Sequence, residues 1–598
     1  MPGLLDTHAA NGTNTINVPV LIVGGGPAGL LSAYMLSKLG VQSLLIEKYP
    51  ERLAAPKAHA LCPRSLEICR QFGLDTMEMR RQGSPRDDAY WVNFVTNLSG
   101  ERIGVLPYER MDSKVLEATP EMIHNIPQPG FEQFVAKELE DDPNVQIRKG
   151  VAFVTCEQKE TDKVITTVEE RATKTRWQIT SRHVIACDGA KSQVRKDLGI
   201  ESEGEDGYET MMTIHFNADL RPVVKDRVGM LHWITDPACS GFIIAYDLGG
   251  NHVLISNFDS NKHPANTWDQ DLCRTTLKAA IGQDIPFSVL SYRPWLLSRK
   301  VAKTYRQLNV FLVGDAAHSF PPTGGLGLNS GIADAHNIAY KIAAVHQGWA
   351  GDSILDSYDA DRRQIALVNS AQSVKNGKKI FSFLKALGTA GIDDVGKARE
   401  NLHRSIHDPA KQQMIAREVE AQREHFDNLE IHIGYVYGDK ETPPNASNFT
   451  PKFVPGARVP HAWIKPLDAS VLDETRPLDV SYVKEFDTNE VATRQYSTLD
   501  LCSIDAFTML ASAVEPWTQK FEALQTVLEK HGIKARLWVA GVDFEFTGNE
   551  QKALFEKDGH FAAGGALLVR PDQHLLQCPS SETTVEELQS LILGHLGL

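Results

Sequence analysis

Two glycine-rich segments, nearly three hundred residues apart, have the residue types and spacing that suit the binding of a phosphate-containing ligand. The first runs from Gly24 to Gly29 and reads Gly-Gly-Gly-Pro-Ala-Gly, which has the spacing Gly-x-Gly-x-x-Gly. In that spacing the first glycine allows a tight turn, the second lets backbone approach a diphosphate, and the third lets a helix pack closely on a strand. The N-terminus of such a helix favours a phosphate group, because its N–H groups are free and its dipole end is positive.

The second segment places an acid and several glycines after a short apolar run. Asp315 follows the run Val310–Val313, at the strand end where open α/β sheets bind their ligands. A carboxylate there can accept hydrogen bonds from the hydroxyl groups of a sugar-like chain. The glycines within residues 324–327 leave the backbone bare, so a flat ring could lie against it. We expect Asn329 or Ser330 to cap the helix that follows, because both side chains can accept from backbone N–H groups.

Strands and helices must flank the first segment if its glycines are to bind a nucleotide. Residues 18–23 form an apolar, β-branched run of strand length, and residues 30–39 have apolar residues at helical spacing. Gly40 suits the left-handed position after a helix end. A second apolar run, residues 41–46, ends in Glu47, where a carboxylate can bind a ribose diol and disfavours a 2′-phosphate. The order strand–turn–helix–strand therefore predicts binding of FAD or NAD rather than NADP.

The second segment also has its flanking elements. Apolar residues at helical spacing from Ile332 to Val345 predict a helix, whose N-terminus would stabilise negative charge on a reduced ring. A third element, in which a strand starting at Val184 ends in Asp188-Gly189, lies between the two segments. A single nucleotide touched by both glycine segments must be long, with its ends far apart in the fold. FAD is such a molecule.

These three elements, in this order, resemble the pattern of the class A single-component FAD-dependent aromatic hydroxylases, and most of all that of the phenol and chlorophenol hydroxylases. The family pattern consists of the glycine fingerprint, an Asp-Gly motif, and Gly-Asp-Ala-x-His followed by Pro and Gly-x-Gly. Further segments look like family segments, namely Lys57 to Glu67, Gln128 with Glu132, and 355–363, where Asp361 replaces the family's Glu. The resemblance extends from about residue 18 to the C-terminus.

The resemblance implies an α/β fold: an FAD-binding Rossmann-like domain, an inserted substrate-binding β-sheet domain and a C-terminal thioredoxin-like domain. The expected division is FAD domain 1–200, substrate sheet 201–299, second part of the FAD domain 300–400, helical connection 401–454, and thioredoxin-like domain 455–598. The last of these lacks a Cys-x-x-Cys pair, so we expect a structural or dimer-stabilising role and a homodimer. Residues expected to bind FAD are Gly24, Gly26, Pro27, Ala28, Gly29, Glu47, Lys48, Arg64, Gln128, Asp188, Asp315, Pro322, Gly324, Gly325, Gly327, Leu328 and Asn329.

The implied reaction is hydroxylation of a phenolic substrate with NAD(P)H and dioxygen, through a flavin 4a-hydroperoxide. The cofactor carries the hard chemistry, while the protein holds the ring, excludes water and helps to deprotonate the phenol. His59 is the candidate base, because its ordinary pKa suits proton exchange near neutrality, and a structural histidine is the alternative. Tyr246, on a strand of the substrate sheet, is the candidate hydrogen-bond partner of the phenol, and sheet packing is the alternative. Weaker candidates for lining the pocket are His215, His232, Trp233 and Trp295.

Composition sets further bounds on the class of protein. The chain has 598 residues, 42% hydrophobic and 23% charged, with net charge −14 and no basic run, which argues against nucleic acid or an anionic membrane as partner. The first seventeen residues lack an apolar signal core, and the eight cysteines have no Cys-x-x-Cys spacing. We therefore expect a cytoplasmic protein with reduced thiols. No His/Cys cluster has recognisable metal-ligand spacing, so no metal is predicted.

Three rival functions remain open from the sequence. One is a flavin monooxygenase that acts on a polyketide or other natural-product ring, by oxidative dearomatisation or decarboxylation. A second is a flavin-binding protein without turnover, which the intact Asp315 motif disfavours. The third is a plain NAD-dependent dehydrogenase. A flavin halogenase is disfavoured because the sequence has no Trp-x-Trp-x-Ile-Pro element.

Overall fold

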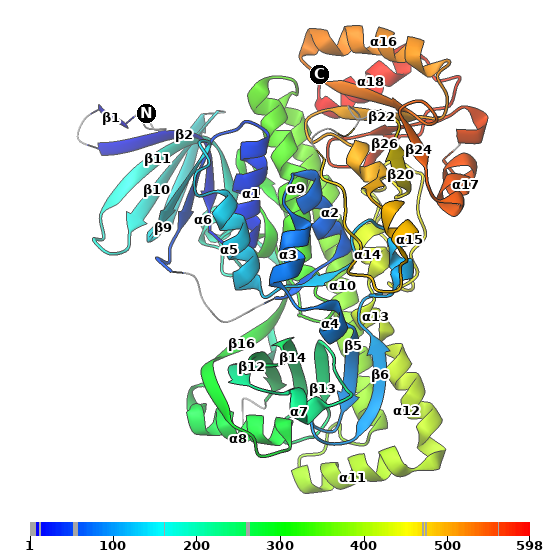
Figure 1. Ribbon diagram of the computed structural model, residues 1–598. Helices are drawn as coiled ribbons and strands as arrows, with labels where there is room; N and C mark the ends of the chain where they lie inside the picture. Colours follow the sequence, from blue (N-terminus) through cyan, green and yellow to red (C-terminus); the bar gives the residue numbers. More distant parts are fainter. Residues whose placement is uncertain are drawn as a thin grey trace.

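The computed structural model describes residues 7–10, 13–51, 58–160, 162–258, 264–468, 472, 475–559 and 561–598. Lys57, in one of the family-like segments, lies outside these residues. Two large sheets and a C-terminal α/β region make up the described chain, and the second sheet lies below the first in Figure 1. Within the described residues no helix has both the length and the apolar character needed to cross a membrane.

The first sheet has nine strands and a parallel centre, in the order β17-β18-β11-β2-β3-β8. Its inner strands are apolar and buried at the ends that lie near the glycine motifs, as parallel strands covered on both faces must be. The bounds are β2 Thr13–Val23, β3 Ser43–Glu47, β8 Val145–Lys149, β11 Arg176–Ala186, β17 Arg306–Gln307 and β18 Val310–Leu312. Antiparallel additions off this path are β1 Thr7–Ala10, β9 Val151–Glu160 and β10 Lys163–Glu170.

The helices beside this sheet confirm the expected order around the first glycine segment. Helix α1 (Pro27–Lys38) joins β2 to β3 and starts three residues before the predicted helix, because proline fits the first helical turn. Gly40, after its end, has φ +75°. Helix α9 (Leu326–Gln347) packs on α1 and is buried almost all round. Other helices of this part are α2 Pro63–Gln71, α3 Thr76–Gln82, α5 Gln128–Glu138 and α6 Gln193–Asp197.

The start of α9 corrects one prediction. Its N-cap is Gly325, with φ +64° and no side-chain cap, so neither Asn329 nor Ser330 caps it. Both residues lie inside the helix and are buried. A left-handed glycine ends the preceding loop and lets the helix begin a full turn earlier than the side-chain pattern indicates.

The second sheet has eight strands in the order β19-β16-β12-β15-β14-β13-β5-β6. It extends beyond the expected segment 201–299, because β5 pairs in parallel with β13 and β19 pairs with β16. The bounds are β5 Trp91–Val95, β6 Arg102–Pro107, β12 Ser202–Ala218, β13 Leu231–Ile234, β14 Gly241–Asp247, β15 Asn251–Asn257, β16 Phe287–Ala302 and β19 His318–Ser319.

The two faces of this sheet pack against different partners, because alternate side chains of a strand point to opposite sides. One face, with Ile243 and Leu254, packs on α7 (Arg221–Val224) and α8 (Gln270–Ile281). The other face, with Ile244 and Tyr246, packs on Ala60, Tyr108 and helical segments after residue 356. These segments are α10 Asp356–Ala386, α11 Val395–His407, α12 Pro409–Ala421, α13 Arg423–Phe426 and α14 Leu429–Ile433.

The C-terminal region carries a four-stranded sheet in the order β23-β22-β25-β26. The predicted strands at 537–540 and 565–572 correspond to β23 Ala535–Val539 and β25 Ala566–Val569. Other elements are β20 Trp463–Pro466, β21 Tyr496–Ser497, β22 Phe507–Ala511, β24 Phe544–Phe546, β26 Leu575–Gln577, α15 Thr488–Ala492, α16 Trp517–Leu528, α17 Asn549–Lys557 and α18 Val585–Leu596. Small elements are β4 Ala60–Leu61 and β7 His124–Asn125, which pair with each other, and α4 Arg86–Ala89, which lies beside β5 in Figure 1.

Candidate functional site

The fold brings the three sequence motifs together. An added Cβ on Gly24 would lie 2.3 Å from the carbonyl oxygen of Cys187, so the first motif touches the residue before Asp188. An added Cβ on Gly314 would lie 3.3 Å from the Cβ of Ala28, so the third motif touches the first. Strand pairing explains the meeting, because β2 and β18 flank β11 in one parallel sheet. One ligand can therefore contact all three motifs.

The first motif has room for a ligand at its middle glycine. An added Cβ on Gly29 would lie only 2.0 Å from the carbonyl oxygen of Gly24, so this position is filled by protein. Around Gly26 no atom lies within 4 Å of an added Cβ. Gly26 is also the N-cap of α1 and provides no side-chain acceptor for the first N–H groups of the helix. An open backbone with free N–H donors fits the diphosphate of FAD.

The acidic residue after the second strand supports the glycine turn. Glu47 Oε2 accepts from the backbone N–H of Gly25 at 2.7 Å, and Oε1 accepts from that of Tyr49 at 2.8 Å. Lys48 is exposed, and its ammonium group lies 5.2 Å from the centre of the Tyr49 ring. Contacts of Glu47 with a ribose and of Lys48 with FAD stay predictions.

The two aspartates of the later motifs lie at strand ends, as expected. Asp188 follows β11, and its Oδ2 accepts from the N–H groups of Gln193 and Val194 at the start of α6. Its buried Oδ1 has no hydrogen-bond partner in the described structure. Asp315 follows β18 within a single 3-10 turn, Gly314–Ala316, and is exposed.

A buried charge holds the backbone of the third motif. Asp334, on α9, accepts from the N–H of Gly314 at 3.1 Å and from His318 Nε2 at 2.8 Å, and Arg362 donates to its other oxygen at 2.8 Å. Burial by itself raises the pKa of Asp334, but the neighbouring His318 and Arg362 outweigh it, and the pKa is lowered. The ring of His318 also stacks on that of Phe320, with 4.7 Å between the ring centres. The supporting role of Asp334 was missed, since only the fold places it beside Gly314.

Asn329 ties the glycine loop to the segment that carries His59. Its Oδ1 accepts from the N–H of Cys62 at 2.9 Å, and its Nδ2 donates to the carbonyls of Ala60 at 3.0 Å and Gly325 at 2.8 Å. The loop itself is turned by a hydrogen bond from Gly325 N to the carbonyl of Pro322 at 3.1 Å.

The loop glycines differ in the space around them. An added Cβ on Gly325 would meet only the Cβ of Ala60, at 3.9 Å, and one on Gly327 would meet nothing within 4 Å. Gly324 has φ +98°, and an added Cβ there would lie 3.1 Å from Asn376 Nδ2 and 3.5 Å from Asn428 Nδ2. Leu328 is half-buried. The open positions are compatible with a flat ring lying on the loop, and direct contacts with FAD stay predictions.

Arg64 and Gln128 lie close to protein partners. Arg64 is buried on α2 and donates to Gln573 Oε1 at 2.6 Å, to the carbonyl of Asp572 at 2.9 Å and to Glu67 at 3.1 Å. Its Nε has no partner among the described residues. Gln128 starts α5 and donates to Glu132 at 2.8 Å. Arg64 thus links the FAD-binding part to the C-terminal region, and its contact with FAD stays a prediction.

The candidate base lies where the two large sheets meet. His59 Nδ1 lies 2.9 Å from Asn125 Oδ1, and β4 beside it pairs with β7. Burial lowers the pKa of His59 to about 4, although the hydrogen bond with Asn125 partly opposes this. In this orientation of Asn125 the Nδ1 of His59 carries the proton, so Nε2 is the basic atom.

The other candidate and a further tyrosine lie beside His59. The ring of Tyr246 meets that of His59 edge-on at 5.7 Å, and the ring of Tyr108 stacks on it at 6.4 Å. Both tyrosines are buried, and burial is the main cause that raises their pKa values, so each stays a protonated donor. No hydrogen bond to the hydroxyl of Tyr246 occurs within the described chain. Tyr108 was missed from sequence, because it precedes β12 by almost a hundred residues and joins the site only through the fold.

The weaker candidates divide between the faces of the second sheet. Trp233 lies on the face of Tyr246, and its ring stacks on Phe242 at 5.0 Å. Strand alternation puts His232 on the opposite face, where Nε2 lies 2.9 Å from the carbonyl of Arg227, so it does not line a site near Tyr246. His215 pairs with Asn251 at 2.9 Å. Trp295 is half-buried and packs against the cluster that contains Tyr246.

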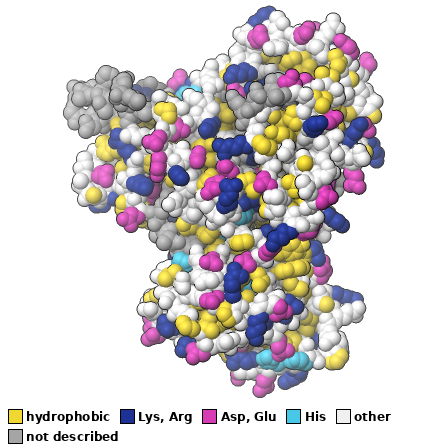
Figure 2. Space-filling model, viewed as in Figure 1, with side chains coloured by type: hydrophobic (Ala, Val, Ile, Leu, Met, Phe, Trp, Pro, Cys, Tyr) yellow, Lys and Arg dark blue, Asp and Glu magenta, His cyan; other side chains and the backbone are white. Residues whose placement is uncertain are grey.

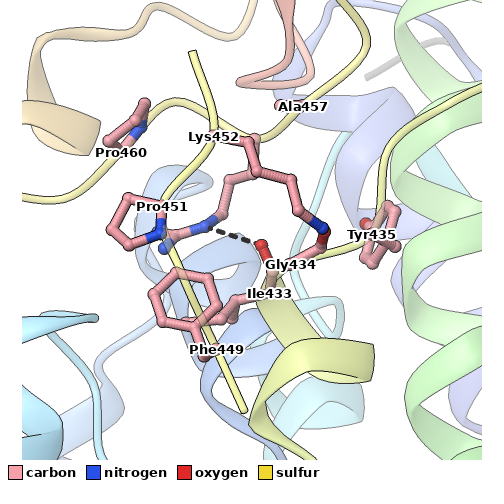
Figure 3. Close-up of a pocket in the computed structure, with 9 residues that line it drawn as sticks. Ile433, Gly434, Tyr435, Phe449, Pro451, Lys452, Ala457 and Pro460 are labelled. Carbon is pink, nitrogen blue, oxygen red and sulfur yellow. Dashed lines mark hydrogen bonds between the residues drawn. The ribbon is translucent and has the colours of Figure 1, made fainter. Parts of the chain in front are cut away.

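A small pocket lies elsewhere, after the end of α14 (Figure 3). Lys452 reaches into it and donates to the carbonyl of Gly434 at 2.5 Å. Its lining residues are Ile433, Gly434, Tyr435, Phe449, Pro451, Lys452, Ala457, Arg458 and Pro460. None of the residues predicted to bind FAD or substrate lines it.

Comparison with known proteins shows the family to which the chain belongs. Residues 17–372 match the family described as FAD binding domain. The chain is 27% identical to 2,4-dichlorophenol 6-monooxygenase of Cupriavidus pinatubonensis over 94% of this chain and 93% of the relative. It is also 27% identical to tetracenomycin B2 monooxygenase-dioxygenase of Streptomyces olivaceus, over 97% and 98%. The crystal structure of the flavin-dependent monooxygenase PieE with FAD and substrate has the same fold, with a TM-score of 0.84 at 24% identity over 97% of this chain and 99% of that one. The chain belongs to the FAD-binding-domain family and, within it, to the class A FAD-dependent aromatic hydroxylases.

Proposed function

We propose that this monooxygenase uses NAD(P)H and dioxygen to hydroxylate a phenolic ring that lies between the glycine loop of α9 and the Tyr246 face of the second sheet. The observation that carries this placement is the grouping of His59, Tyr108 and Tyr246 next to Ala60, which faces Gly325. FAD, when bound, supplies the electron transfer and the activation of dioxygen. The residues around it orient the ring and control one proton.

His59 is the acceptor for the phenol proton in this proposal. A pKa of about 4 makes it neutral at pH 7, with Nε2 free to accept. An ordinary phenol has a pKa of about 10, so full transfer to His59 would cost about 8 kcal/mol at 1.36 kcal/mol per unit. His59 alone therefore deprotonates ordinary phenols poorly, and acidic phenols are favoured. The relative named for 2,4-dichlorophenol supports a substrate of this kind.

Tyr246 is the donor to the substrate oxygen. Its pKa is raised by burial, so its hydroxyl donates and does not ionise. A hydrogen bond from this hydroxyl to the developing phenolate would strengthen as negative charge grows, which is the condition for catalysis. Ser84 fixes the strand at this point, because its hydroxyl donates to the carbonyl of Tyr246 at 2.8 Å.

A natural-product ring is the second candidate substrate. The relative named for tetracenomycin B2 supports it. A larger ring system would need the same donor and acceptor but more room along the Tyr246 face. Dearomatisation or decarboxylation would then accompany or replace simple hydroxylation.

Substrate-stimulated NAD(P)H oxidation, with product and hydrogen peroxide measured together, tests the proposal. Phenol, 2,4-dichlorophenol and a polycyclic hydroxyaromatic compound form the panel, each with NADH and NADPH. We expect product formation to favour the dichlorophenol over phenol. The Tyr246→Phe variant should lose product while keeping FAD, and Tyr292→Phe, at a 39% exposed residue, is the matched control. Equal product from Tyr246→Phe and the wild type would refute the role of Tyr246.

For the C-terminal region we propose a thioredoxin-like fold without redox function. Its strand order, with β22 parallel to β23 and antiparallel to β25, supports this fold. Its buried contacts with the FAD-binding part, such as Arg570 with Asp361 at 2.9 Å, support a structural role. We further propose that the protein is cytoplasmic and forms a homodimer. Sedimentation of the FAD-loaded protein tests the oligomeric state.

A further inference from the structure

Two histidines and a glutamate meet on the surface, far from the glycine motifs. His403 and His407 lie one turn apart on α11, and Glu101 precedes β6 at the end of the β5–β6 turn. His403 Nδ1 lies 3.4 Å from Glu101 Oε1, and His407 Nε2 lies 2.9 Å from Glu101 Oε2. Each of the three residues offers one ligand atom that lies within 4.8 Å of a ligand atom of the other two.

These separations come close to those between the ligands of one small metal ion. Zn²⁺ binds histidine nitrogen and carboxylate oxygen at about 2.0–2.2 Å in tetrahedral sites, which puts neighbouring ligand atoms about 3.4 Å apart. The longer contact has this length, and the shorter one needs a shift of about half an ångström by exposed side chains. Three protein ligands leave one position of the tetrahedron for water.

The hydrogen bonding of His407 prepares it as a ligand. Its Nδ1 lies 2.8 Å from the carbonyl oxygen of His403, which can only accept, so Nδ1 carries a proton. Nε2 therefore faces the Glu101 carboxylate, and either a second ring proton or a metal ion must lie between these two groups. Donation from the second ring nitrogen to a backbone carbonyl is the usual arrangement of a metal-bound histidine.

The surroundings favour a cation that arrives from solvent. The exposed fractions of the side chains are 49% for Glu101, 47% for His403 and 62% for His407. Both histidines lie in the last turns of α11, where the negative end of the helix dipole attracts positive charge. Figure 2 shows histidine side chains gathered at the lower edge of the molecule, over α11.

We propose that Glu101, His403 and His407 bind a divalent transition-metal ion of the Zn²⁺ type. The ion would fasten α11 to the edge hairpin of the second sheet, whose strand β5 carries Phe94 into the cluster that contains Tyr246. An ion pair between Arg399 and Asp236, at 2.9 Å, already joins α11 to this sheet. The site is independent of FAD and of the substrate.

The sequence alone does not reveal this site. A His-x-x-x-His pair on a helix is common without a metal, and the third ligand lies about three hundred residues earlier. Glu101 lies near the histidines for two reasons. Strand β5 pairs with β13 and β6, which fixes the turn that carries Glu101, and α11 and α12 pack below the sheet.

Calorimetric titration of the full-length, tag-free protein with Zn²⁺ tests the proposal. We expect one tight equivalent in the wild type, and a drop in affinity of about tenfold or more in each of three variants. The variants are Glu101→Gln, His403→Ala and His407→Ala, all at exposed positions, and His531→Ala is the control at another exposed histidine. Unchanged binding by His407→Ala, or no binding in the wild type, would overturn the proposal.

Hydrogen exchange separates this site from zinc bound by a cysteine. With Zn²⁺ added after chelator treatment, amides of residues 96–101 and of the last turn of α11 should exchange more slowly in the wild type. The same amides should not respond in His407→Ala. Slowing that is equal in both proteins, or confined to segments around the free cysteines, would contradict a site at Glu101.

Discussion

The substitution Gly26→Ala separates cofactor binding from folding. Gly26 has φ −77° and ψ −175°, an extended conformation that alanine adopts, and an added Cβ there meets no atom within 4 Å. The apoprotein should therefore fold as before, with an unfolding free energy equal to the wild type or higher by about 0.4–1 kcal/mol, because alanine restricts the unfolded chain.

Binding of FAD should weaken in the same variant. The methyl group occupies the space through which the N-terminus of α1 approaches a diphosphate, and one charge-assisted hydrogen bond is worth about 1.5–3 kcal/mol. Loss of one such bond raises the dissociation constant about 10- to 150-fold. Titration of apoprotein into FAD, followed by flavin fluorescence, measures the constant, and urea unfolding of the apoprotein measures stability.

Two further glycine variants act as controls. Gly594→Ala, at an exposed position of α18 with open space around it, should leave FAD affinity unchanged. Gly29→Ala should destabilise the apoprotein itself, because its Cβ would lie 2.0 Å from the carbonyl oxygen of Gly24. The reasoning is refuted if Gly26→Ala binds FAD as tightly as the wild type.

Three more predictions concern the proton chemistry and the buried charges. Tyr246→Phe should lower the yield of product per NAD(P)H about tenfold or more through loss of a hydrogen bond to developing charge, with FAD affinity unchanged; a normal yield would exclude it as donor. Burial lowers the pKa values of His232 and His252 to about 4, whereas unfolded histidine has about 6.5, so the unfolded state binds more protons between these values. The contribution of each histidine to the free energy of unfolding should be fully present above pH 6.5 and should fall by up to about 3 kcal/mol towards pH 4. A urea midpoint of unfolding that stays constant from pH 7 to 4.5 would contradict this. Arg570→Met should cost about 3–5 kcal/mol, because it leaves the completely buried Asp572 without its partner at 2.5 Å, and urea unfolding measures the loss.

The local elements of the FAD-binding part were predictable from sequence. The run before Gly24 is β-branched and uniformly apolar, and the next ten residues have helical spacing, so β2, α1 and β3 follow from period and composition. The same reasoning placed β18 and the body of α9. The prediction of where α9 starts was wrong. Side chains that can cap a helix do not indicate that a glycine in the left-handed conformation precedes them and starts the helix earlier.

Contacts between distant segments were beyond prediction. Asn329 looked like a cap, but its partners Cys62 and Ala60 lie more than 260 residues earlier. Arg64 is predicted to bind FAD, and the sequence did not indicate its three hydrogen bonds to protein, one of them to Gln573 across 509 residues of sequence. The periodicity of apolar residues predicts local elements, but it does not indicate which distant side chains form hydrogen bonds with one another. The approach of His59 and Tyr246 was anticipated only from the family resemblance, not from the residues themselves.

We propose that this chain couples NAD(P)H oxidation to oxygen insertion into a phenolic ring. The most direct measurement is the ratio of hydroxylated product to NAD(P)H consumed by the FAD-loaded protein, with 2,4-dichlorophenol and phenol as substrates and peroxide quantified in parallel. We expect a ratio near one for the better phenol, and a lower ratio for Tyr246→Phe. Oxidation of NAD(P)H that no phenol or polycyclic hydroxyaromatic compound stimulates would contradict it.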